Sequence, residues 1–252
     1  MGDHVGVAKF VMRGFSINNQ VFCYNVLYSK SYKISVNKLG TINGYYDREV
    51  EQQLLASGIE SGFASVYYQI LGETNLERMC EITNENKVTI QNYLSLMYSR
   101  SRVILKMVND DRKFLEQFGV LTHSNLLVIS KKLKNNFLRI IGEEYVIIPF
   151  KLLNCHAKIV NNSIGFGISI NKHNKISIYF PFNSELLLLF VGVSNKPAYA
   201  YRTISSDEES LVKMINEIMC FTEYFFGNGF IFGINQSTVQ NCMELFKDIE
   251  ND

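Results

Sequence analysis

The clearest candidate for chemistry is a pair of arginines in the apolar stretch NYLSLMYSRSRVILKMVN, residues 92–109. On a helical projection of about 100° per residue, the apolar side chains cover an arc of about 200°. Arg100 falls inside this arc, whereas Arg102 lies at its polar border. A buried guanidinium needs a carboxylate, several carbonyl oxygens or an anionic ligand. Two interpretations therefore stand: Arg100 pairs with an internal acid, or it belongs to a site for an anion or phosphate.

Two glutamates can supply carboxylates for acid–base or metal chemistry, Glu51 and Glu60. They are nine residues apart, which places them on opposite faces of a straight helix. They converge only if the helix breaks near Gly58, and otherwise they are solvated side chains or stabilise the first turn. Glu51 is the preferred partner of Arg100. Tyr45 and Tyr46, just before the predicted helix, either line a pocket beside Arg100 or serve packing.

The histidines and cysteines do not form a metal-binding pattern. His4, His123, His156 and His173 lack the HxxxH and HExxH spacings, so we expect structural or exposed side chains and no metal site. Five cysteines are scattered without a CxxC, which favours reduced and mostly buried thiols. No cofactor is indicated.

The charge balance argues against a protein that coats nucleic acid. Lys and Arg total 25, Asp and Glu total 24, and the net charge is +1. A protein that binds mainly through phosphates usually has a clear basic excess. One cluster of basic residues has two interpretations, a solvated helix face or a local contact with RNA or DNA. It contains Lys131, Lys132, Lys134 and Arg139.

The N-terminal residues do not resemble a secretory signal, and the apolar run LLLLFVGV is too short to span a bilayer. We therefore expect a cytoplasmic protein without membrane contact. The abundance of Asn, Lys and Ile suggests an AT-rich genome, bacterial or phage.

The order of expected elements is strands, helices, strands, helices, which predicts an α+β fold. We expect one domain over residues 1–252, with an antiparallel sheet from the N- and C-terminal thirds. A central helical segment, about 73–145, is a candidate insert. The expected elements are strands within 7–39, a helix over 47–72, a helix over 90–109 capped by Thr89, strands from 145 with a hairpin at 171–174, a helix over 206–228 and a last helix capped by Ser237.

The helix over 206–228 carries a stripe of large apolar residues at helical spacing. The spacing favours a face turned toward the core, with a dimer face as the alternative. The stripe contains Met214, Ile218, Phe221, Tyr224 and Phe225.

Several segments resemble the bacterial family called domain of unknown function 4238. The segments VAKFVMRGFS, SLMYSRSRVILK and IYFPFNSELLLLFVG are similar to three of its patterns, and the second places Arg100 on the family's arginine. His4 lies one residue out of step with the family's histidine. Ala8, Met97 and Ile170 stand where the family has proline, glutamine and aspartate.

The resemblance implies a bacterial protein whose relatives lie in part near defence genes, with no settled activity. Two functions follow. The first is a defence-associated, anti-phage or toxin-like protein that binds a protein partner or ligand, or forms a homodimer. The alternative is an enzyme-like effector that acts on nucleotides or nucleic acid through Arg100 with Glu51 or Glu60. The missing family residues favour the first.

Overall fold

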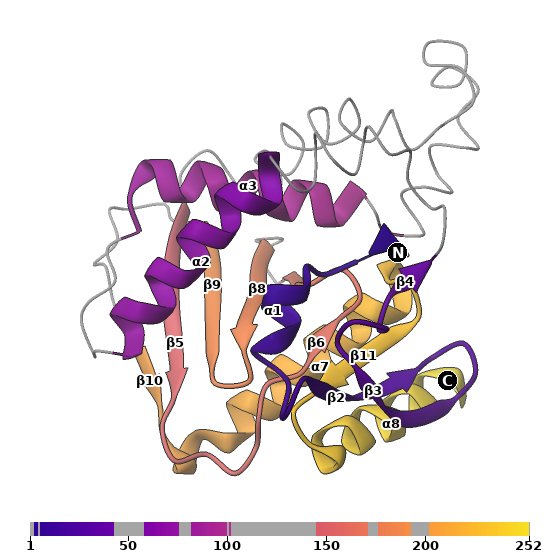
Figure 1. Cartoon of the computed structure of the whole chain (residues 1–252). Coiled ribbons are helices and arrows are strands. Elements are labelled where there is room, and N and C mark those ends of the chain that lie inside the picture. The colour runs from indigo at the N-terminus through magenta and orange to yellow at the C-terminus, as the bar shows by residue number, and fades with distance from the viewer. Residues whose placement is uncertain are drawn as a thin grey trace.

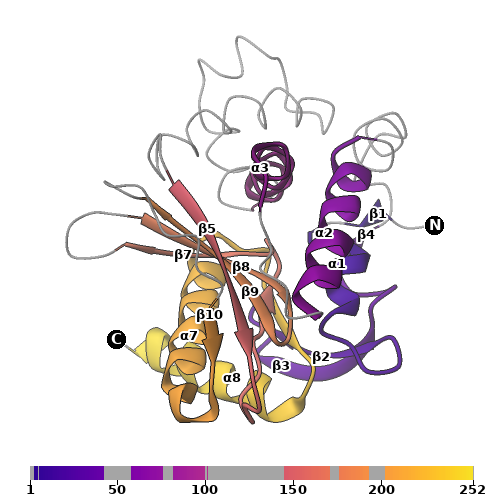
Figure 2. The same cartoon turned by 90° about the vertical axis from the view of Figure 1, so that its left-hand side faces the viewer.

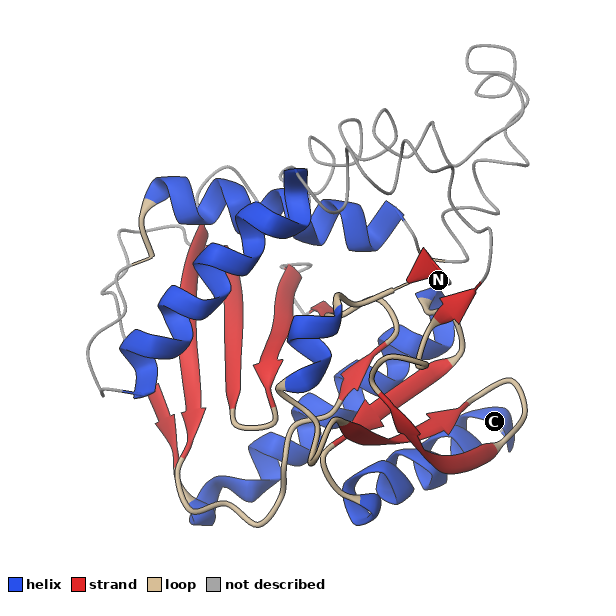
Figure 3. Cartoon of the chain, viewed as in Figure 1, coloured by secondary structure: helices blue, strands red, loops and turns tan. Residues whose placement is uncertain are grey.

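The computed structural model describes residues 3–4, 6–42, 58–75, 82–99, 101, 145–170, 176–192 and 202–251 (Figure 1). Within them, the strands are β1 (Asp3–His4), β2 (Gln20–Asn25), β3 (Lys30–Ser35), β4 (Thr41–Ile42), β5 (Tyr145–Leu152), β6 (Asn161–Asn162), β7 (Gly167–Ile170), β8 (Ile176–Asn183), β9 (Leu186–Gly192), β10 (Arg202–Ile204) and β11 (Phe230–Gly233). The helices are α1 (Lys9–Arg13), α2 (Glu60–Asn75), α3 (Asn84–Ser99), α7 (Glu209–Phe226) and α8 (Gln236–Asn251), with a 3₁₀ turn at Ser206–Glu208. The predicted α+β class is confirmed, as the mixture of helices and strands in Figure 3 shows.

The larger sheet has five strands in the order β10-β5-β9-β8-β7. All neighbours are antiparallel except β10 and β5, which are parallel. Its central strands are apolar on both faces because both faces are covered. Along β9, Leu188 and Phe190 pack into the core beneath α2 and α3, whereas Leu187 packs against Val212 and Ile215 of α7. Figure 2 shows these helices on opposite sides of the sheet.

The second sheet joins distant parts of the chain in the order β3-β2-β11-β6. All its neighbours are antiparallel, and β11 lies between β2 and β6. The expected sheet from the N- and C-terminal thirds is therefore present. The five-stranded sheet, built from residues 145–204, is a separate one that the sequence did not distinguish.

The stretch SINNQ, residues 16–20, is typical of a hairpin tip, and the structure confirms a turn there. Asn18 and Asn19 have φ values of 51° and 60°, and Ile17 pairs with Gln20 across them. Asparagine tolerates this left-handed backbone better than most residues, which is why it suits two-residue hairpin turns. The predicted hairpin between β7 and β8 is likewise confirmed by their antiparallel register.

Four boundary predictions are wrong. The strand signal over 7–39 includes α1, where Val11 and Met12 are buried against the core. The helix expected to end at Gly72 continues to Asn75.

The helix expected from Thr89 begins at Asn84 instead, because the Thr83 hydroxyl accepts a hydrogen bond from the Asn86 N–H at 3.1 Å. Similarly, Asn235 rather than Ser237 caps α8, by accepting from the Thr238 N–H at 2.9 Å.

An aromatic cluster holds the first three helices on the five-stranded sheet. Phe63 of α2 stacks on Tyr93 of α3, with ring centroids 4.0 Å apart. The Tyr93 hydroxyl accepts a hydrogen bond from the Ala8 N–H at 3.1 Å, just before α1. Tyr67 of α2 donates its hydroxyl to the Phe182 carbonyl of β8 at 2.6 Å. Ring packing and satisfied hydroxyls therefore fix α1, α2 and α3 together.

Candidate functional site

Most of the predicted site lies outside the described residues. This applies to Arg100, Arg102, Glu51, Tyr45 and Tyr46, and to the basic cluster of Lys131, Lys132, Lys134 and Arg139.

Two predicted residues can be placed. The backbone of His4 lies in β1, opposite Thr41 of β4. Glu60 is the first residue of α2 and is half-buried.

The helix that leads to Arg100 is shorter than predicted. α3 ends at Ser99, and Ser101 lies in a bend, with its N–H donating to the Tyr98 carbonyl at 3.0 Å. The predicted apolar face is confirmed up to this point, since Tyr93, Leu94, Leu96 and Met97 are all fully buried. Arg100 and Arg102 lie outside the described residues, so their places on the helical projection stay predictions.

α7 packs against α8 and against the strands β6, β7 and β11. Three polar side chains recur on its inner face at intervals of seven residues, which is about two turns. Glu209 Oε1 accepts from the His156 N–H at 2.6 Å, and Asn216 Oδ1 accepts from the Val160 N–H at 3.0 Å. Glu223 completes the series further along. The inner face of α7 thereby supplies partners to a chain segment that has few ladder hydrogen bonds of its own.

Glu223 is a buried carboxylate surrounded by hydrogen-bond donors. Its side chain accepts from the N–H and hydroxyl of Ser163, at 2.9 Å and 2.7 Å to Oε2. Oε1 accepts from the N–H groups of Gly229 and Phe230, at 2.6 Å and 2.9 Å. Ser163 is fully buried and Glu223 is 2% exposed. One carboxylate therefore ties α7 to the turn after β6 and to the start of β11.

The ionisation of Glu223 makes the stability of the folded protein depend on pH. Burial raises the pKa of its carboxyl above the ordinary value of 4.5, although the hydrogen bonds from Ser163, Gly229 and Phe230 lower it. Because the folded-state pKa is the higher one, the contribution of this proton to stability is fully present below the unfolded-state pKa. It is lost as the pH rises through the folded-state pKa.

We therefore expect wild type to lose stability relative to Glu223→Gln, which cannot titrate, as the pH is raised from 4 to 8. Urea unfolding of both proteins across this range measures the difference. A difference that grows in favour of wild type with rising pH would contradict the expected sign.

The outer face of α7 is apolar and exposed. Met214, Phe221 and Phe225 are 40%, 45% and 56% exposed, and lie with Ile218 on one side of the helix. The expected core face is therefore wrong: the buried face of α7 contains Val212, Ile215, Met219 and Cys220 instead. Asn216, Thr222 and Glu223 are buried because their side chains accept hydrogen bonds from backbone N–H groups of the chain that follows β5. The usual arrangement, in which a helix buries apolar side chains and exposes polar ones, is therefore reversed at these positions.

A groove of about 720 Å³ separates the N-terminal halves of α7 and α8. Most of the residues that line it are of polar types, among them Lys213 and Glu209 from α7, Asn241 and Glu244 from α8, and His156 from the loop after β5. Within the described part of the chain, no group of three or more His, Cys, Asp or Glu side chains is arranged to hold a metal ion. No described helix is long and apolar enough to cross a membrane.

The prediction of reduced and mostly buried thiols is confirmed for the described cysteines. Cys23, Cys155, Cys220 and Cys242 are buried free thiols, and Cys80 lies outside the described residues. Burial raises the pKa of the Cys23 thiol to about 12 and that of Cys220 well above its ordinary value. Thiols held protonated in this way are poor nucleophiles.

Sequence reasoning missed Glu223 and Ser163. Both were hidden because a glutamate on a helix normally faces solvent, and a serine in an Asn-rich stretch suggests a turn. On the predicted helix Glu223 lies opposite Met214 and Phe221, so the expected burial of that stripe placed Glu223 toward solvent. Comparison with protein-family models, curated proteins and solved structures finds no match, so the resemblance to family 4238 stays a prediction.

Proposed function

We propose that this chain is a defence-associated bacterial or phage protein that acts by binding a protein partner through the outer face of α7. The observation that supports this is the exposed apolar stripe of Met214, Phe221 and Phe225. Aromatic residues and methionine are enriched where proteins bind one another, and contiguous exposed apolar patches are uncommon on monomeric proteins.

The neighbouring strand extends this apolar surface. Gly167 of β7 approaches α7 so closely that a Cβ at this position would lie 2.9 Å from Ile218 Cγ2. The next residue, Ile168, donates its N–H to Thr222 Oγ1 at 2.9 Å. Ile170, at the end of β7, is 65% exposed. A partner with a complementary apolar face can therefore contact both the helix and the strand.

The alternative, an enzyme-like effector that acts on nucleotides or nucleic acid, depends on Arg100 and Glu51, outside the described residues. Glu60 is the one candidate carboxylate that the structure places. The binding proposal has the stronger support, because the residues of the α7 stripe on which it rests are all described.

Phe221→Ser with Phe225→Ser is expected to abolish the interaction, because these rings give the stripe most of its apolar area. Light scattering after gel filtration measures self-association. Affinity capture from a bacterial lysate, followed by reconstitution with the purified captured protein, measures a hetero-complex.

Ile17→Ser is the matched control, since Ile17 is also apolar and 53% exposed but lies in the turn before β2. The proposal is wrong if the double variant keeps every association that wild type shows. It is equally wrong if Ile17→Ser loses the association to the same extent.

A further inference from the structure

The N-terminal part of the chain has a charge bias that the overall composition conceals. Between His4 and Asp47 the sequence has no acidic residue, while it contains Lys9, Arg13, Lys30, Lys33 and Lys38. All except Lys9 are exposed, and none has an ion-pair partner among the described residues. A positive surface therefore exists on a protein of net charge +1.

Two of these lysines lie on β3, the edge strand of the four-stranded sheet. Strand alternation places Lys30 and Tyr32 on one side of β3, and Ser31 and Lys33 on the other. Tyr32 is 40% exposed, and Tyr28 in the preceding turn is 72% exposed. We call residues Gln20–Ser35 the basic hairpin. It carries aromatic rings and cations along a sheet edge to which no further described strand is added.

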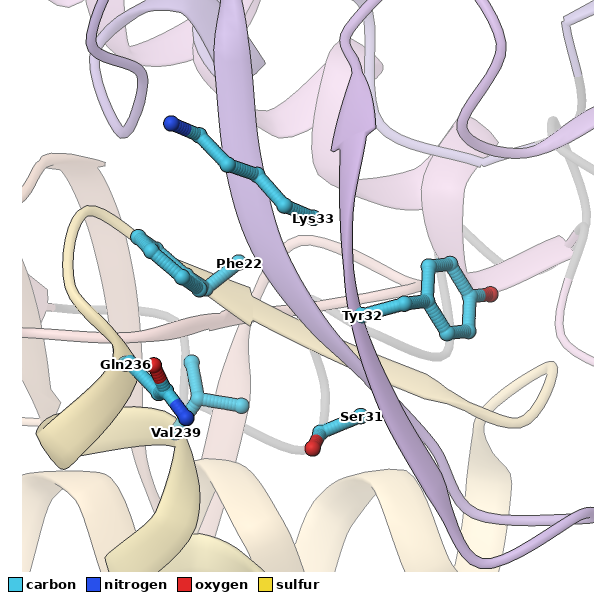
Figure 4. A pocket seen from close by; sticks show the side chains of 6 residues that line it. All are labelled: Phe22, Ser31, Tyr32, Lys33, Gln236 and Val239. Atoms are coloured by element: carbon cyan, nitrogen blue, oxygen red, sulfur yellow. The ribbon is translucent and has the colours of Figure 1, made fainter.

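A small pocket opens beside the basic hairpin, where α8 begins (Figure 4). Phe22 and Lys33 are cross-strand neighbours, and Lys33 Nζ lies 5.5 Å from the centroid of the Phe22 ring. Ser31 and Gln236 add a hydroxyl and an amide, while Tyr32 points away to the other side of the strand.

The pocket volume is about 130 Å³. Pockets for whole small ligands usually measure about 300–1,000 Å³. This pocket therefore has room for one flat group of a longer molecule, with polar atoms available for its edge.

We propose that the basic hairpin binds single-stranded nucleic acid. Tyr28 and Tyr32 stack on bases on one side of β3, where Lys30 contacts a phosphate. The bound single strand then crosses the sheet edge, so that Lys33 contacts a phosphate on the other side and the pocket beside Phe22 receives one base edge. Single strands offer both the charge and the exposed base faces that this surface fits, whereas a duplex hides its base faces. This surface is separate from the outer face of α7, so the inference goes beyond the proposed partner binding.

The test uses the full chain and fluorescence anisotropy with a labelled 20-nucleotide single strand of mixed sequence, compared with the same sequence as a duplex. We expect tighter binding to the single strand. Lys30→Ala with Lys33→Ala should weaken the affinity at least tenfold. It should also reduce the slope of log K against log salt by about 1.4, since each phosphate contact on a single strand contributes about 0.7.

The aromatic variants test stacking separately from charge. Tyr28→Ala and Tyr32→Ala should each weaken binding roughly fivefold or more, while Tyr32→Phe, which keeps the ring, should bind like wild type. Lys213→Ala removes an exposed lysine from α7 and should have no effect. The proposal fails if the duplex binds as tightly as the single strand, or if the lysine variants weaken binding and the tyrosine variants do not. It also fails if the protein binds phosphatidylserine vesicles but not the oligonucleotide.

Discussion

Replacing Glu223 by alanine is expected to destabilise the protein by about 3–5 kcal/mol, because several buried donors lose their common acceptor. The N–H groups of Ser163, Gly229 and Phe230 would all lose their acceptor. Each buried donor left without a partner costs about 1–3 kcal/mol, and water entering the vacated space recovers part of this. The free energy of unfolding, measured in urea at neutral pH, tests the expectation.

Two further variants separate the hydrogen bonds from the charge and the volume. Glu223→Gln keeps the shape but points an amide N–H₂ at donors, so it should recover only part of the loss. Glu217→Ala, on the same helix, removes a half-buried carboxylate that makes no hydrogen bond to the described residues, and should change stability by less than about 1 kcal/mol. Equal losses for Glu223→Ala and Glu217→Ala would show that the buried network contributes nothing specific.

The fold could be predicted from sequence where local pattern and tertiary burial agree. β9, with its apolar run, is buried on both faces as expected. α7 was also predicted as a helix, and a capping box of Ser205 and Glu208 begins the 3₁₀ turn that precedes it. The predicted starts of helices were wrong where a short-range hydrogen bond to a capping side chain determines the first turn, as at Thr83 and Asn235.

The orientation of α7 could not be predicted because two of its faces compete for the core. A count of apolar residues favours burying Phe221 and Phe225. The structure instead buries Asn216, Thr222 and Glu223, because the irregular chain from His156 to Ile168 leaves backbone N–H groups that a helix side chain must satisfy. Sequence periodicity records hydrophobicity alone and contains no information on where such a segment will lie.

The buried polar face of α7 and its exposed apolar face have one physical cause. Hydrogen bonds to Glu209, Asn216 and Glu223 fix the rotation of the helix about its axis. That rotation leaves Met214, Phe221 and Phe225 toward solvent. Loss of the Glu223 hydrogen bonds is therefore expected to weaken partner binding as well as stability, although Glu223 itself is buried.

Replacing Phe63 by alanine is expected to cost about 3–5 kcal/mol, the range for removing a fully buried phenylalanine from a packed core. Phe63 is 0% exposed. Its ring lies within 6.0 Å of five others, measured between centroids: Phe10, Tyr67, Tyr93, Phe180 and Phe182. These rings come from α1, α2, α3 and β8, so the cavity would loosen the contact of three helices with the sheet.

Tyr68→Ala is the matched control for this expectation, because Tyr68 lies on α2 as well but is 56% exposed. Its loss should be below about 1 kcal/mol. Hydrogen exchange gives a second readout: in Phe63→Ala, the amides of α3 should exchange faster, since Tyr93 would lose the ring on which it stacks. If α3 stays protected and only α2 loosens, the cluster does not hold α3 on the sheet.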